Sequence, residues 1–109
     1  MTGTPQLDAI VSGDGAKFSE YGRYRHKDLA DQIVCNGGAR LSAQASQTHY
    51  CTPRVDDGPY SKVEVGYPDP APPESWAKYA DGDYPSDMYG YVPVELVREY
   101  IVSHGGEKE

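Results

Sequence analysis

The chain has 109 residues and a formal net charge of −7, and Leu, Ile, Val and Phe together supply only 17 of those residues. A chain of this length is expected to form one domain around one core, covering residues 1–109 with loose ends at 1–6 and 105–109. No stretch is long and apolar enough to cross a bilayer, and the N-terminal sequence lacks the pattern of a targeting segment, so we expect a soluble, cytoplasmic protein.

Ten tyrosines accompany this shortage of aliphatic side chains. Because a tyrosine ring is large and apolar, we expect several of them to help build the core, with each hydroxyl hydrogen-bonded or at the surface. Residues 1–54 hold five acids against six bases, whereas residues 55–109 hold twelve acids against four bases. The acidic half should repel phosphate backbones and anionic lipid and attract cationic surfaces, which argues against direct nucleic-acid or membrane binding.

The first predicted elements are two short strands in a hairpin. Leu7–Val11 is an apolar run that stops at the turn signal Ser12–Gly15, and Lys17–Tyr24 can return beside it. The basic cluster Arg23–Lys27 follows, and its single tyrosine and few cations fall short of a nucleic-acid footprint. We interpret this cluster as a solvated strand end or as the internal partner of the acidic half, with a phosphate contact as the alternative.

A first helix is predicted over Asp28–Asn36. Asp28 can cap its N-terminus, and Leu29, Ile33 and Val34 fall on one face at helical spacing. The glycines that follow Asn36 are the expected stop signal, because glycine readily adopts the left-handed conformation found just past a helix end.

Two strands are predicted next. Arg40–Gln47 and Tyr60–Tyr67 both alternate between apolar and polar residues, with Tyr67 assigned to the same face as Val63 and Val65. These strands most simply pair antiparallel, and the long connection between them, His49–Pro59, is a candidate working loop.

The remaining elements complete the predicted domain. Pro68–Pro73 should run as a stiff, extended connector, and Glu74–Ala80 can form one or two helical turns that anchor Trp76 in the core. Met88–Val92 is predicted as a further strand and Pro93–Ser103 as a second helix. Together the elements predict an α+β fold, with an antiparallel sheet of three to five short strands and two short helices on one face.

The best candidates for chemistry are His49 and Cys51, which are two residues apart and could act as base and nucleophile. With Cys35 and His26 they could also supply four zinc ligands. Neither set has the local spacing of a known catalytic or metal motif, so we interpret His49 as a hydrogen-bonded structural residue and both cysteines as buried, unpaired thiols. No cofactor or metal is predicted.

The sequence therefore favours a non-enzymatic protein-binding module, an inhibitor that docks an acidic, tyrosine-rich face onto a basic and possibly nucleic-acid-binding surface of a partner protein. In overall character the chain resembles the small acidic proteins that phages make against host defences, including anti-CRISPR proteins. The alternatives are an assembly protein of a larger particle and a small Cys/His enzyme. The candidate contact residues are Asp69, Glu74, Tyr79, Asp81, Asp83, Tyr84, Asp87 and Tyr89.

Overall fold

The computed structural model describes residues 3–108 and confirms a small α+β domain. Four antiparallel strands form one sheet in the order β3-β4-β5-β6, and β1 and β2 form a separate two-stranded hairpin. The elements in chain order are α1 (Pro5–Ser12), β1 (Phe18–Tyr21), β2 (Tyr24–Lys27), β3 (Ile33–Val34), β4 (Arg40–Gln44), β5 (Lys62–Asp69), the 3₁₀ helix η1 (Glu74–Tyr79), β6 (Met88–Pro93) and α2 (Val94–Ser103).

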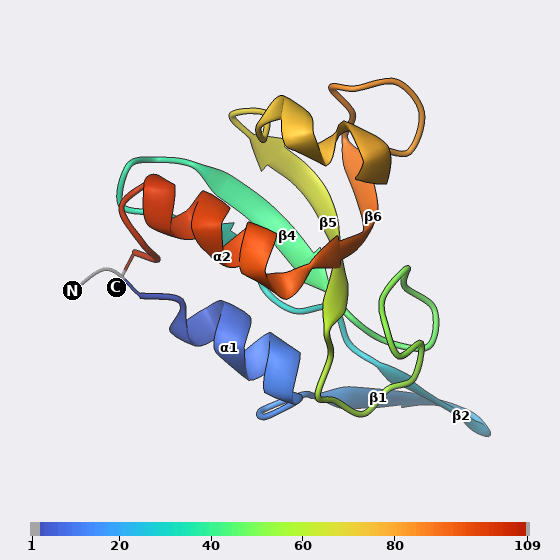
Figure 1. Cartoon of the computed structure of the whole chain (residues 1–109). Coiled ribbons are helices and arrows are strands. Elements are labelled where there is room, and N and C mark those ends of the chain that lie inside the picture. The colour runs from blue at the N-terminus through green and yellow to red at the C-terminus, as the bar shows by residue number, and fades with distance from the viewer. Residues whose placement is uncertain (1–2, 109) are drawn as a thin grey trace.

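Helices α1 and α2 lie side by side against one face of the four-stranded sheet (Figure 1). An ion pair of 2.8 Å between Arg98 of α2 and Asp8 of α1 joins them. Beneath the helices, buried side chains of all four strands form the core with Leu7 and Ile101. No helix in residues 3–108 has the length and apolar character that crossing a membrane requires.

The predicted strand Leu7–Val11 is wrong, because this segment belongs to helix α1. Leu7 is its fully buried residue, and Gly13 ends the helix in the left-handed conformation with φ 87°. At the other end of α1 the buried Glu107 carboxylate accepts hydrogen bonds from the backbone amides of Gln6 (2.6 Å) and Leu7 (2.9 Å). A carboxylate from the far end of the chain thus satisfies two amides that have no partner within the helix.

The expected loose ends are also corrected where the structure describes them. Residues 1, 2 and 109 lie outside the described residues. The backbone amide of Glu107 donates to the Gly3 carbonyl, and that of Lys108 donates to the Val34 carbonyl. The two ends of the described chain are therefore held together beside α1.

The predicted helix Asp28–Asn36 is wrong as well. Residues 28–32 are irregular, and Ile33–Val34 forms β3. The Gln44 side chain holds the irregular segment through hydrogen bonds to the amide (2.8 Å) and carbonyl (2.9 Å) of Ala30. Ile33 and Cys35 are buried whereas Leu29 is exposed. Burial therefore alternates with a period of two, and the glycine pair serves a turn between β3 and β4.

The later predictions are largely confirmed. The segment Arg40–Gln47 contains β4, Tyr60–Tyr67 overlaps β5, and the two strands pair antiparallel. β5 continues through Pro68 and Asp69, so these two residues belong to the strand and not to the predicted connector. Met88–Val92 lies within β6. Pro93 is the residue before α2, where its missing amide hydrogen leaves no partner unsatisfied. The hairpin is different from the one predicted, because β1 pairs with β2 and both lie within residues 18–27.

Aromatic side chains build the part of the core that lies between η1, β6 and α2, as the composition indicates. Trp76 of η1 is buried and meets Tyr89 edge-on at 5.6 Å and Tyr100 at 5.9 Å. The Tyr100 hydroxyl donates to the carbonyl of Pro70, so α2 is linked to the proline-rich connector. Trp76 is thus the core anchor that the sequence predicts.

Candidate functional site

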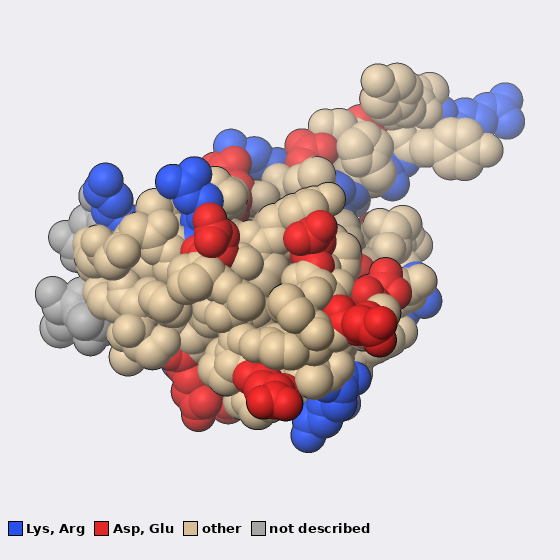
Figure 2. Space-filling view, turned by 90° about the horizontal axis from the view of Figure 1, so that it is seen from above, with Lys and Arg blue, Asp and Glu red and all other residues tan. Residues whose placement is uncertain are grey.

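Five exposed carboxylates follow one another between the end of β5 and the start of β6. None of them forms an ion pair or a side-chain hydrogen bond within residues 3–108, and Lys78 is the single base in this part of the chain. Figure 2 looks down on η1 and the loop that follows it, and shows separate acidic groups set in an uncharged surface. We call these residues the acidic surface: Asp69, Glu74, Asp81, Asp83 and Asp87.

The tyrosines predicted to share this surface do not all lie on it. Tyr89 is fully buried, packs on Trp76 and accepts a hydrogen bond from the Ser86 amide through its hydroxyl. Tyr89 therefore cannot contact a partner from this position, and its prediction as a contact residue is wrong. Tyr79 and Tyr84 are half-buried against the core, and the Tyr84 hydroxyl donates to the carbonyl of Pro72. These two rings therefore pack mainly beneath the acidic surface, against the core.

Three other tyrosines are exposed on the strands and on the loop before β5, and we call them the outward tyrosines: Tyr50, Tyr67 and Tyr91. Their side chains are 52%, 65% and 40% exposed, respectively. Tyr67 and Tyr91 have φ angles of 51° and 55°, in the left-handed region where a bulky residue is an outlier. The sequence analysis did not select any of the three.

Each left-handed tyrosine lies in a β-bulge. On β5, Tyr67 and Pro68 together oppose Leu41 of β4, because the register shifts between the pairs Ser42–Gly66 and Arg40–Asp69. On β6, Gly90 and Tyr91 together oppose Glu64 in the same way. A glycine precedes both tyrosines, and a glycine inside a strand pattern is a known sign of a bulge. The repeated Gly-Tyr pair was therefore the signal available in the sequence.

The bulges tie the outward tyrosines to neighbouring acids. The Tyr67 amide donates to the carbonyl of Asp87 at 2.6 Å, which places Tyr67 at the edge of the acidic surface. The Tyr50 amide donates to the Glu64 carboxylate at 2.9 Å, and the Tyr50 and Tyr91 rings lie 5.7 Å apart. The outward tyrosines thus combine exposed aromatic area with nearby negative charge.

His49 and Cys51 both contact neighbouring groups of their own chain. His49 Nδ1 lies 2.6 Å from Ser46 Oγ, within one turn of the chain. The buried Cys51 thiol lies 3.2 Å from the carbonyl oxygen of Ser46 and 3.3 Å from that of Pro53. Burial raises the pKa of Cys51, and burial together with Glu107 raises that of Cys35, so neither thiol is activated as a thiolate.

Metal-binding geometry was tested on the same residues. The cysteines are unpaired and buried, and within residues 3–108 no three His, Cys, Asp or Glu side chains gather as metal ligands would. The four residues considered as zinc ligands, His26, Cys35, His49 and Cys51, are therefore not brought together.

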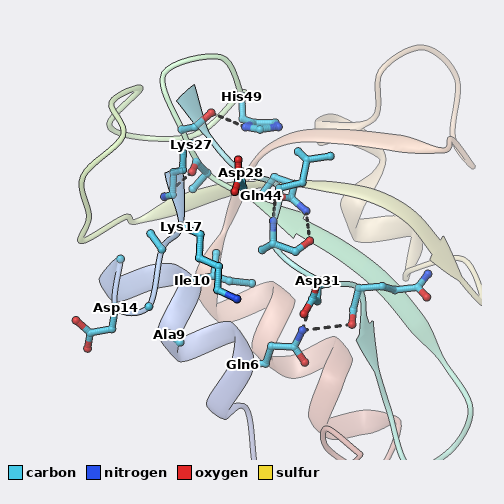
Figure 3. A pocket seen from close by; sticks show the side chains of 18 residues that line it. Gln6, Ala9, Ile10, Asp14, Lys17, Lys27, Asp28, Asp31, Gln44 and His49 are labelled. Carbon is cyan, nitrogen blue, oxygen red and sulfur yellow. Dashed lines mark hydrogen bonds between the residues drawn. The ribbon is translucent and has the colours of Figure 1, made fainter. Parts of the chain in front are cut away.

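A hollow of about 460 Å³ lies between α1 and residues 28–32 (Figure 3). Its amide side chains hold the chain itself: Gln6 donates to the carbonyls of Asp31 (3.0 Å) and Gln32 (3.2 Å), and Gln44 binds both backbone groups of Ala30. Its remaining charged groups carry both signs, including Lys17, Asp14 and Asp28. We assign these contacts to fixing the irregular segment.

The basic cluster Arg23–Lys27 lies on the β1–β2 hairpin. Figure 2 shows this hairpin as an arm that projects from the body, with basic side chains at its far end. Lys27 is at its root, where the ammonium donates to the Ala45 carbonyl (2.8 Å) and the Tyr60 hydroxyl (3.1 Å). No ion pair joins Arg23 or Arg25 to the acidic surface in the part of the chain described, so these two arginines are not its internal partner.

The described residues therefore offer unpaired charge and exposed aromatic area, both of which suit recognition of another molecule. Comparison with protein-family models, with curated proteins and with solved structures gives no match.

Proposed function

We propose that this chain is a non-enzymatic protein-binding module, which docks its acidic surface onto a basic surface of a partner protein. The observation that carries this proposal is that the five carboxylates of the acidic surface are exposed and have no partner of their own within residues 3–108. Some carboxylates elsewhere in the fold, such as Asp8 and Glu107, are bound by the chain itself, whereas others, such as Asp14 and Glu99, are exposed without an ion pair within residues 3–108. The acidic surface differs in having five such acids in succession along the chain.

The outward tyrosines supply the contact area that carboxylates lack. Tyrosine is enriched at the centres of protein interfaces, because it buries a large ring and orders few rotatable bonds. Tyr67 lies beside Asp87 and is the closest link between the two groups. A lysine or arginine of the partner can pair with the carboxylate while its stem packs on the ring, which favours a basic surface over a neutral one.

Two of the outward tyrosines, Tyr67 and Tyr91, are held in a conformation that costs energy. A non-glycine residue in the left-handed region costs on the order of 1 kcal/mol. Such strain persists where the surrounding structure requires it, and it is concentrated at binding sites. The strained, exposed positions of Tyr67 and Tyr91 support a recognition role for this side of the sheet.

The function that follows is inhibition by charge mimicry. If the basic surface of the partner normally binds nucleic acid, the exposed carboxylates of the acidic surface compete with the phosphates for the same cations. Long-range attraction would also speed association, and this contribution decreases as salt screens the charges.

The test is affinity capture from cells of the source organism with three baits: the unaltered chain, a variant carrying Asp81→Lys, Asp83→Lys and Asp87→Lys, and a matched control. The control carries Asp14→Lys, Asp31→Lys and Glu99→Lys, which changes the net charge equally at exposed carboxylates away from the acidic surface. We expect a partner that binds the unaltered chain and the control but not the first variant.

Folding of each bait is checked by thermal unfolding before capture. A partner that binds all three baits equally would refute the assignment of the acidic surface. A partner lost from both variants would show that net charge alone, rather than this surface, governs binding, and it would refute the proposal too.

A further inference from the structure

The tip of the β1–β2 arm has one aromatic face. Tyr21 and Tyr24 are directly paired across the hairpin, and Ser19 is paired with His26. Because alternate residues of a strand point to the same side, Tyr21, Tyr24 and His26 share one face. The Tyr21 and His26 rings stack at 6.1 Å, whereas Arg25 lies over Phe18 at 4.0 Å on the opposite face.

This aromatic face is unusually exposed. Tyr21 and Tyr24 are 76% and 78% exposed, the highest values among the large hydrophobic side chains described. Gly22, with φ 59°, and Arg23 form a two-residue turn between them, so the arm ends in a tight hairpin. Large rings held on a projecting ribbon are a contact surface for another molecule.

The charge of the tip identifies its partner. The arm, residues 18–27, carries Arg23, Arg25, Lys27 and His26 against one acid, Glu20, which is paired with Arg25 across the hairpin, and His26 lies 3.8 Å from Asp28 at the root. Arg23 at the turn has no acid beside it within residues 18–27, although the chain as a whole has a net charge of −7. Arg25 lies on the opposite face with Phe18, so the cation beside the two tyrosines at the tip is Arg23. The complement of this tip is a set of exposed carboxylates beside exposed tyrosine, which is what the acidic surface and Tyr67 provide. Within residues 3–108 no ion pair joins the arm to the acidic surface of its own molecule, so both surfaces are free to contact a second molecule.

We propose that the β1–β2 arm of one copy of this chain docks on the acidic surface of a second copy. The contact joins two different surfaces, so it is head-to-tail and builds rings or short chains rather than a closed two-fold dimer. The inference rests on the acidic surface of the proposed function, because the arm of a neighbouring copy and the foreign partner would compete for it. In the self-associated protein, the foreign partner would have to displace the arm of the neighbouring copy before it could bind the acidic surface.

The test is sedimentation velocity on the purified full chain from about 10 µM to about 500 µM, at about 20 mM and about 500 mM salt. We expect association that increases with concentration at low salt and is lost at high salt. Two charge-swap variants are compared, one with Arg23→Glu and Arg25→Glu, the other with Asp81→Lys, Asp83→Lys and Asp87→Lys. For each variant alone, the association constant should fall by more than about tenfold, which corresponds to roughly 1.4 kcal/mol.

A mixture of the two variants should associate again, because the native arm of the second fits the native acidic surface of the first. The control variant Lys62→Glu with Lys108→Glu changes the net charge as much as the arm variant does, at two exposed positions away from the arm, and should behave as the unaltered chain. A second pair of variants tests the rings: Tyr21→Ser with Tyr24→Ser should weaken association, whereas Val55→Ser with Val102→Ser, at two exposed apolar positions outside the arm and the acidic surface, should not.

A monomer at the highest concentration and low salt would overturn the inference. So would association that persists in both charge-swap variants, or a mixture that stays monomeric. These results would leave the proposed function standing if capture of a foreign partner still depends on Asp81, Asp83 and Asp87. Capture of a nucleic acid or of another protein by the arm, without self-association, would also overturn the inference.

Discussion

Tyr67 is exposed and its backbone is strained. Replacing it should therefore affect partner binding without lowering the stability of the fold. Its ring is 65% exposed, so little apolar area is lost when it is removed. Its φ of 51° is one that glycine adopts freely. Tyr67→Gly should therefore leave the free energy of unfolding unchanged or raise it by up to about 1 kcal/mol.

Urea denaturation measures this effect, and Tyr24→Gly is the matched control. Tyr24 is also largely exposed, at 78%, but has no positive φ, so glycine should lower the stability there by roughly 0.5–1 kcal/mol. Tyr67→Gly should at the same time weaken partner binding. A loss of stability larger at Tyr67 than at Tyr24 would contradict the view that the structure holds Tyr67 under strain.

Glu107 makes the opposite prediction, because it contributes to stability and not to binding. Its buried carboxylate accepts two backbone amides at the start of α1. Hydrogen bonds to a charged group contribute roughly 1.5–3 kcal/mol, so Glu107→Gln should lower the free energy of unfolding by about 1–3 kcal/mol. Glu99→Gln on the exposed side of α2 should change it by less than about 0.5 kcal/mol. Equal effects of the two variants would contradict the role given to Glu107.

Single residues were the hardest feature to predict from the sequence. The acids of the acidic surface could be selected because charge and turn composition place them outside the core. Tyr89 was misassigned because the alternating pattern of a strand shows which residues share a face but not which face is covered. Tyr67 was misassigned because a bulge inserts one extra residue and reverses the alternation beyond it.

At the scale of elements, the contact between α1 and the loop before β5 gives a direct prediction. A Cβ atom on Gly58 would lie 2.7 Å from the carbonyl oxygen of Ser12 and 2.8 Å from that of Val11. Gly58→Ala must therefore push the end of α1 away and should lower the free energy of unfolding by about 1–3 kcal/mol. Gly3→Ala is the control, since its Cβ would meet only Pro5 at 3.7 Å.

Thermal and urea denaturation of the two alanine variants measure the difference. Equal stability of the two would show that the loop and α1 do not pack as described.

The strands β4 and β5 were predictable from the sequence, whereas the structures of Leu7–Val11 and Asp28–Asn36 were not. The same physical reason explains both failures. Apolar and polar residues alternate over Arg40–Gln47 and Tyr60–Tyr67, which indicates strands of a sheet that is covered on one face. In Leu7–Val11 and Asp28–Asn36 the apolar runs are too short to separate a period of two from one of 3.6. Long-range contacts decide these segments: Glu107 starts the helix in the first, and the Gln44 amide holds an irregular chain in the second.

At the scale of the whole molecule, two buried phenols make stability depend on alkaline pH. Burial, as the largest cause, raises the pKa values of Tyr60 and Tyr100 to about 12. The unfolded chain releases these protons from about pH 10, so ionisation favours the unfolded state between about pH 10 and pH 12. The stability that depends on these phenols is complete below pH 10 and is lost as pH rises through the folded pKa values.

Urea denaturation at about pH 9 and about pH 11.5 measures this loss, at roughly 1.4 kcal/mol for each pKa unit of difference between folded and unfolded chains. The buried thiols also have raised pKa values, so the comparison is made with a variant carrying Tyr60→Phe and Tyr100→Phe. This variant should lose less stability over the same range. An identical loss in both proteins would assign the pH dependence to other groups.

The separation of charge over the molecule is the feature that connects its parts: a basic, aromatic arm projects from a body whose acidic surface has no partner of its own in residues 3–108. The sequence shows the imbalance between its two halves, but only the fold shows that, within residues 3–108, the arm forms no ion pair with the acidic surface. A molecule arranged in this way binds other charged surfaces in a manner that salt controls.

The most direct test of the central claim is the affinity of the captured partner for the purified chain, measured by titration calorimetry across a series of salt concentrations. We expect the affinity to decrease steadily as the salt concentration rises. At low salt, the combined substitutions Asp81→Lys, Asp83→Lys and Asp87→Lys should lower the affinity by more than about tenfold. An affinity that is independent of salt and unchanged by these three substitutions would contradict docking through the acidic surface.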